Sequence, residues 1–109
     1  MLPYTIDEIK RRIQPVAEKY GLRAIYLFGS YARGEATPQS DIDLIIDTSG
    51  TAIRSLLQLA AVYNDLEEAL GVGIDLVTQD SLEQQTDRVS QLHFREAIQR
   101  ERKIIYAAA

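Results

Sequence analysis

The sequence predicts one domain of the α+β (mixed α/β) class. Its 109 residues suit a single compact unit, so we treat residues 1–109 as one domain. Two long segments repeat apolar residues at helical spacing, and three short segments are rich in β-branched or aromatic residues. The resulting order is helix, strand, strand, helix, strand, helix and a short closing strand, which is typical of this class.

The first helix is predicted to follow Thr5. Thr5 with Glu8 three residues later is a capping-box pattern, which satisfies free backbone donors at a helix start. The apolar residues of this segment keep helical spacing: Ile6, Ile9, Ile13, Val16, Ala17 and Tyr20. Pro15 lacks a backbone donor and is expected to kink or split the helix, and Gly21 is expected to end it.

Two strands and a polar loop are predicted next. Residues 23–28, RAIYLF, predict a strand, and residues 30–40 predict a loop with room for one helical turn after Ser30. Residues 41–47, DIDLIID, predict a second strand, whose successive side chains point to opposite faces. One face would carry Ile42, Leu44 and Ile46, and the other Asp41, Asp43, Ile45 and Asp47.

The second half of the chain repeats these signals. Residues 51–70 predict a helix that Gly71 ends. Its expected core face is Ile53, Leu56, Leu57, Ala60, Tyr63, Leu66 and Leu70. Residues 72–78, VGIDLVT, predict a third strand with Asp75 facing away from its apolar neighbours. A helix from about Leu82 or Arg88 to Arg100 and a closing strand, KIIYA, follow; the final AAA looks like an added tail and receives no role.

Composition narrows the classes of function. The chain has no cysteine, which excludes disulfides and thiolate metal sites. Its net charge of −4 argues against a domain that binds nucleic acid mainly through phosphates, although bound metal ions could still attract a polyanion. No apolar run is long enough to span a membrane and the first residues lack a signal-peptide pattern, so we expect a cytoplasmic protein.

Three aspartates form the strongest candidate site. Asp41 and Asp43 share one face of a strand, about 6.6 Å apart, and Asp75 would join them if its strand lies alongside, about 4.8 Å away. Crowded carboxylates repel one another unless cations lie between them, and carboxylates with substrate phosphates suit Mg²⁺. Two such ions about 3.5–4 Å apart promote displacement at phosphorus, one activating the attacking hydroxyl and one holding the triphosphate. Carboxylates alone do not distinguish Mg²⁺ from Mn²⁺.

Gly29 and Ser30 fit a phosphate site at the end of the first strand. Glycine lets backbone amides approach a ligand closely, and a following helical turn would aim N–H groups at phosphate. The Ser30 hydroxyl can donate a hydrogen bond, and Arg33 lies a few residues further on. Each feature alone has a simpler explanation, such as a solvated strand edge or a turn. Their conjunction favours a nucleotide site.

This pattern resembles a known family. Gly29-Ser30, ten intervening residues and Asp41-Ile42-Asp43 are similar to the signature of the DNA polymerase beta-like nucleotidyltransferases, and FGSYARGEATPQSDIDLIID resembles their minimal nucleotidyltransferase (MNT) branch. The resemblance implies a small twisted mixed sheet backed by helices. It implies that Gly29 and Ser30 hold nucleotide phosphates. It also implies that Asp41 and Asp43 bind both metals, and that Asp75 completes the metal site and helps to deprotonate the acceptor hydroxyl.

The resemblance also implies a partner. Many MNT proteins are antitoxins of HEPN ribonuclease toxins and transfer AMP from ATP onto a tyrosine of the toxin. The leading hypothesis is therefore a protein adenylyltransferase antitoxin, with ATP known only from the family. Two alternatives stay open: an antitoxin that acts by stoichiometric binding without catalysis, and nucleotidyl transfer to a small molecule or an RNA end.

Two further patterns are judged accidental. Arg88 and His93 match the R-x4-H spacing of HEPN ribonuclease sites, but that motif belongs to a four-helix fold that this strand-rich sequence does not predict. Gly71-Val72-Gly73 begins like a dinucleotide fingerprint but precedes a strand instead of following one. Direct binding of nucleic acid by the basic residues near either end has little support, because such runs usually form solvated helix faces.

Overall fold

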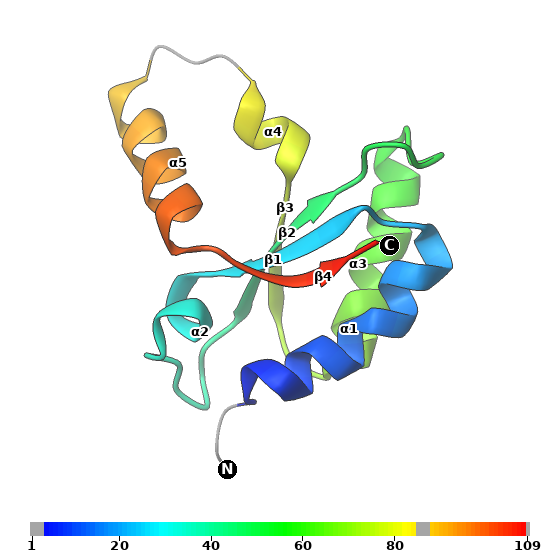
Figure 1. The fold of residues 1–109 in the computed structure, drawn as a ribbon, viewed down its shortest axis with the longest axis horizontal. Coiled ribbons are helices and arrows are strands. Elements are labelled where there is room, and N and C mark those ends of the chain that lie inside the picture. The colour runs from blue at the N-terminus through cyan, green and yellow to red at the C-terminus, as the bar shows by residue number, and fades with distance from the viewer. Residues whose placement is uncertain (1–3, 85–87, 109) are drawn as a thin grey trace.

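The fold is a four-stranded mixed sheet with helices on both faces (Figure 1). The computed structural model describes residues 4–84 and 88–108. The strands lie in the order β3-β2-β1-β4, where β1 pairs antiparallel with β2 and β4, and β2 pairs parallel with β3. The strands are β1 (Ala24–Phe28), β2 (Ile42–Asp47), β3 (Ile74–Thr78) and β4 (Lys103–Ala107). The helices are α1 (Ile6–Tyr20), α2 (Gly29–Arg33), α3 (Leu56–Leu70), α4 (Gln79–Glu83) and α5 (Val89–Glu101). The predicted α+β class is confirmed.

The two faces of the sheet carry different cores. Ile42, Leu44 and Ile46 of β2 are fully buried in the main core, which includes buried residues of α1 and α3. Ile45 points the other way, into a smaller cluster with Phe28, Leu82 of α4 and Ile98 of α5. Figure 1 shows α1 and α3 on one side of the sheet and α4 and α5 on the other. The alternation predicted for β2 is therefore confirmed.

Helix α1 begins as predicted but is not split at Pro15. Thr5 and Glu8 form the capping box, and Gly21 ends the helix in the left-handed conformation with φ +66°. The helix runs unbroken through Pro15, which corrects the expected split. Pro15 and Arg11, the residue whose carbonyl loses a donor, are both exposed, so water can replace the missing hydrogen bond. The buried residues on either side keep the helix packed.

Helix α3 is shorter than the sequence predicts. It begins at Leu56 instead of residue 51, because Ser55 caps it and forms a capping box with Gln58. Leu56 and Leu57 were expected in the core, yet their side chains are 84% and 83% exposed. The buried residues of the helix are Val62, Leu66 and Leu70, and Ala60, also expected in the core, is exposed.

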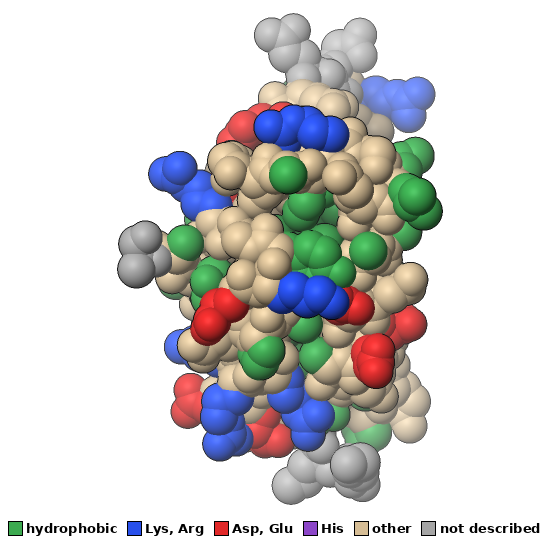
Figure 2. Space-filling view, turned by 90° about the vertical axis from the view of Figure 1, so that its right-hand side faces the viewer, with side chains coloured by type: hydrophobic (Ala, Val, Ile, Leu, Met, Phe, Trp, Pro, Cys, Tyr) green, Lys and Arg blue, Asp and Glu red, His purple; other side chains and the backbone are tan. Residues whose placement is uncertain are grey.

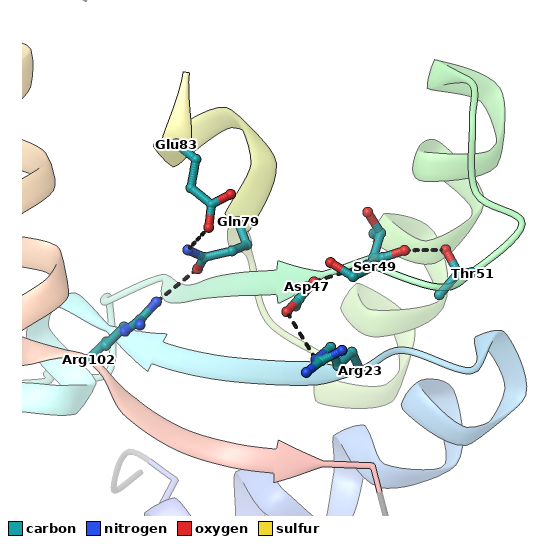
Figure 3. A network of polar contacts seen from close by, with 8 residues as sticks. Arg23, Asp47, Ser49, Thr51, Gln79, Glu83 and Arg102 are labelled. Atoms are coloured by element: carbon teal, nitrogen blue, oxygen red, sulfur yellow. Dashed lines mark hydrogen bonds and ion pairs between the residues drawn. The ribbon is translucent and has the colours of Figure 1, made fainter. Parts of the chain in front are cut away.

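The C-terminal part holds α4 and α5 against the sheet. The Arg102 guanidinium donates to Gln79 Oε1 at 2.8 Å, and Gln79 donates to Glu83 at 3.0 Å (Figure 3). The Arg102 guanidinium also lies 4.2 Å from the centre of the Tyr26 ring. The later of the two predicted starts for the last helix is confirmed, since Arg88 is the N-cap of α5, and α4 is a separate helix before it; residues 85–87 lie outside the described residues. The closing strand predicted for KIIYA is confirmed as β4, in which Ala107 pairs with Ala24.

On the face shown in Figure 2, acidic and basic side chains are mixed, and no large patch of one charge is visible there. Within residues 4–84 and 88–108, no helix has the length and apolarity needed to cross a bilayer.

Candidate active site

Two of the three predicted aspartates are neighbours across the parallel strands β2 and β3. The register pairs Asp43 directly with Asp75, and the backbone N–H of Ile42 donates to the carbonyl of Gly73 at 3.0 Å. Because paired residues of adjacent strands point the same way, both carboxylates lie on the face opposite the main core. The prediction that the strand of Asp75 lies beside that of Asp43 is confirmed.

Asp41 lies near this pair without closing a triangle. Its residue precedes β2, and one carboxylate oxygen of Asp41 lies 2.7 Å from the point where a Cβ on Gly73 would stand. Among the described residues, no three His, Cys, Asp or Glu side chains already form a cluster that could hold a metal ion. Asp43 and Asp75 are the close pair, and Asp41 lies beside Gly73 at the start of the same two strands.

The environment of Asp43 raises its pKa to about 6. Partial burial is the largest cause, followed by the hydrogen bond with Asp75 and the negative charges of Asp75 and Asp41; the charge of Arg33 acts in the opposite direction. A raised pKa of this kind marks a carboxyl that is partly buried beside other negative charges. A bound cation would offset these charges.

This raised pKa predicts how stability depends on pH in EDTA. Asp43 binds its proton more tightly in the folded protein than in the unfolded chain, where its pKa is near 3.8. Its stabilising contribution is therefore complete below pH 3.8 and lost as the pH rises through about 6. We expect the free energy of unfolding of wild type, minus that of Asp43→Asn, to fall across this window in urea titrations. A difference that does not change with pH would contradict the assigned environment.

Gly29 and Ser30 lie at the start of α2, directly after β1. Gly29 has φ +72°, and a Cβ on it would stand 2.0 Å from an Asp43 carboxylate oxygen, so only glycine fits between the turn and the aspartate. The residue before it, Phe28, occupies the N-cap position without a side-chain hydrogen bond to the helix. No described side chain therefore caps the first turn of α2, whose start lies against Asp43. The predicted helical turn is confirmed.

Arg33, predicted to bind phosphate, is engaged by two carboxylates. Its Nε lies 2.5 Å from Glu35, and its Nη1 lies 3.0 Å from Glu101 at the end of α5. Hydrogen bonds to Glu35 and then to Glu101 are the main reasons why its pKa is raised. A phosphate that binds Arg33 would have to compete with these partners, so its predicted role remains a prediction.

A pocket of about 530 Å³ opens beside the aspartates. Gly29, Arg33, Asp43 and Asp75 line its polar end, and α5 contributes Phe94, Ala97, Ile98 and Glu101. Sequence reasoning did not identify this α5 wall, although residues 94, 97, 98 and 101 have the spacing of one helix face. His93, on the same helix, is exposed, as expected for a residue outside the site.

Comparisons with known sequences identify the family of the chain. The nucleotidyltransferase domain family matches residues 9–105. A Methanocaldococcus jannaschii protein, provisionally named a protein adenylyltransferase, is 42% identical over 77 residues, which cover 71% of this chain and 81% of that protein. The protein adenylyltransferase MntA of Thermococcus cleftensis is 38% identical over 86 residues, covering 75% of this chain and 85% of its own length.

Solved structures share the fold. A provisionally named minimal nucleotidyltransferase is 30% identical and has a TM-score of 0.66, with 92% of this chain and 95% of that chain covered. A chain from the complex of a tri-AMPylated Shewanella oneidensis HEPN toxin with an MNT antitoxin has a TM-score of 0.60 at 20% identity, covering 94% and 73%. This chain therefore belongs to the nucleotidyltransferase domain family, in the minimal branch that includes proteins named protein adenylyltransferases.

Proposed function

We propose that this protein is a metal-dependent antitoxin that transfers AMP from ATP to a tyrosine hydroxyl of a cognate HEPN ribonuclease toxin and thereby neutralises it. The observation that carries the proposal is the pairing of Asp43 with Asp75 across β2 and β3, next to Asp41 and the glycine turn that begins α2. The cytoplasm, which supplies ATP and Mg²⁺, is the expected compartment.

The donor set fits a hard divalent cation. Asp41, Asp43 and Asp75 offer only carboxylate oxygens, which Mg²⁺ prefers, and the raised pKa of Asp43 reflects its partial burial first and then the neighbouring carboxylates. We assign these three side chains as the metal ligands, two ions being the expected number and Mn²⁺ a substitute. When bound, the ions would make the acceptor hydroxyl more acidic and offset the charge of the triphosphate.

The chain's own residues would orient the reaction. The backbone at Gly29 and Ser30, with the Ser30 hydroxyl, would hold the phosphates of ATP, while Arg33 would leave a carboxylate partner to bind them. The tyrosine oxygen would attack the α-phosphorus, forming an O–P bond as the bond to the β-phosphate oxygen breaks and pyrophosphate leaves. Asp75 would accept the phenolic proton.

The partner would supply the acceptor. One structural neighbour is a complex of an MNT antitoxin with a tri-AMPylated HEPN toxin, which supports a partner of this kind. A HEPN protein encoded beside this chain is the expected acceptor.

Intact-mass analysis of that neighbouring protein tests the proposal. It would be co-expressed with wild type or with the Asp41→Asn/Asp43→Asn variant. We expect one or more AMP-sized increases with wild type and none with the variant, and tryptic mapping should place the modification on tyrosine.

The same experiment separates the alternative functions. If both versions bind and silence the neighbour without any mass increase, the protein acts by stoichiometric binding. If ATP and Mg²⁺ leave the neighbour unmodified but label an RNA end or a small molecule, the acceptor assignment is wrong and the nucleotidyltransferase assignment stands.

A further inference from the structure

The pocket beside the aspartates is lined by both charged and apolar side chains. Its charged lining residues are Arg33, Asp43, Asp75 and Glu101. The apolar lining residues are Phe28, Leu76, Val77, Phe94, Ala97 and Ile98. Its volume of about 530 Å³ lies within the range of small-ligand sites. Such a pocket suits a group with an apolar body and a polar tip.

The residues of α5 that line the pocket differ in exposure. Ile98 is buried and belongs to the smaller core cluster, whereas Phe94, one helical turn earlier, is 57% exposed. The end of the helix is fixed by the contact of Glu101 with Arg33 at 3.0 Å. Phe94 therefore lines the pocket with an aromatic residue that is more than half exposed. A ligand that covers this ring removes apolar surface from water.

The carboxylates of the pocket can accept a hydrogen bond from an acceptor hydroxyl. Asp43 and Asp75 both line it, and Arg33, the one Lys or Arg among the described lining residues, is paired with Glu35 and Glu101. A phenol fits this lining, because its ring can contact Phe94 while its hydroxyl reaches toward the aspartates.

We propose that Phe94 is the residue that selects the acceptor: it packs against the ring of the acceptor tyrosine in the pocket between α5 and the Asp43–Asp75 pair. This inference rests on the proposed transfer of AMP to a protein hydroxyl. Serine and threonine hydroxyls lack a ring and would leave Phe94 uncovered. The adenine of ATP is the rival occupant, since it too is flat and its exocyclic amine could donate to a carboxylate, and the kinetic constants below distinguish the two.

Steady-state kinetics of AMP transfer to the HEPN protein encoded beside this chain test the assignment. Phe94→Ala is compared with Leu92→Ala, a truncation on the same helix whose side chain is 42% exposed and does not line the pocket. We expect Phe94→Ala to raise KM for the acceptor about tenfold and to leave KM for ATP within about twofold, since one ring contact is lost. Phe94→Tyr should restore the acceptor KM, and Leu92→Ala should leave both constants within about twofold.

Three results would overturn the assignment, and they differ from one another. A rise in KM for ATP with an unchanged acceptor KM would show that Phe94 contacts the adenine. An equal loss in Leu92→Ala would show that α5 provides general docking instead of a ring pocket. Failure of wild type to modify the partner, although it binds ATP with Mg²⁺ by fluorescence titration, would overturn the proposed function and this assignment with it. Circular dichroism melts of each variant establish that it is folded.

Discussion

Asp43→Asn is expected to lower the rate of AMP transfer about a thousandfold and, at the same time, to raise the melting temperature of the protein in EDTA at pH 7.5. The amide keeps the shape of the side chain and can still donate to Asp75, but it removes the charge that the site concentrates. The raised pKa of Asp43, caused first by burial and then by Asp75, shows that this charge is unfavourable without a cation. Activity would be followed by release of pyrophosphate, and stability by thermal melts.

Asp47→Asn is the matched control for this prediction. Asp47 belongs to the same strand and the same face, but it lies at the other end of β2, where it accepts from the backbone N–H of Ser49 at 2.9 Å and lies 3.9 Å from Arg23 (Figure 3). We expect it to keep transfer within about twofold of wild type, since it touches none of the candidate site. Added Mg²⁺ should raise the melting temperature of wild type and Asp47→Asn but not of Asp43→Asn. An active Asp43→Asn protein would remove Asp43 from the catalytic set.

Gly29→Ala should have the second largest effect, with transfer reduced at least about a hundredfold and a lower melting temperature. The new Cβ would stand 2.0 Å from an Asp43 carboxylate oxygen, and the φ of +72° is unfavourable for any L side chain. Either the aspartate or the turn must move, and each movement separates the backbone that we propose to bind phosphate from the carboxylates. Binding of a fluorescent ATP analogue with Mg²⁺ measures the loss directly.

Gly34→Ala separates the clash from the backbone strain. Gly34 has nearly the same conformation, φ +74°, but a Cβ there would meet nothing within 4 Å. The substitution should cost about 1 kcal/mol of stability through strain alone and leave transfer close to wild type. If both glycine variants lose activity equally, the close approach of Gly29 to Asp43 is not what the site requires.

Much of the site was predictable because its signals are local. The alternation of apolar and acidic residues in DIDLIID places Asp43 on the face opposite Leu44, whatever lies around the strand. The glycine before Ser30 likewise marks a turn that needs a positive φ, and the structure has it at +72°. Features of this kind depend on residues one to four apart, which the sequence displays directly.

Helix limits and partners depended on what surrounds each segment. Leu56 and Leu57 fit the helical period of α3, but they are exposed, whereas Val62, Leu66 and Leu70 further along the helix are buried. Pro15 breaks a hydrogen bond in any helix, yet packing on both sides of it keeps α1 continuous. Local propensity is weaker than the burial of a whole helix face, and burial is a property of the assembled fold.

The sequence by itself determined the α+β class, the three strands that carry the motif and the aspartates that mark the site, because strand period and turn chemistry are local. Only the tertiary structure decided that Asp75 faces Asp43, that Arg33 is held by Glu101, 68 residues away, and that Phe94 stands over the same pocket. These contacts join segments that no local pattern relates. They exist only because the sheet and α5 pack together, and that packing is set by the sum of burial over the whole chain.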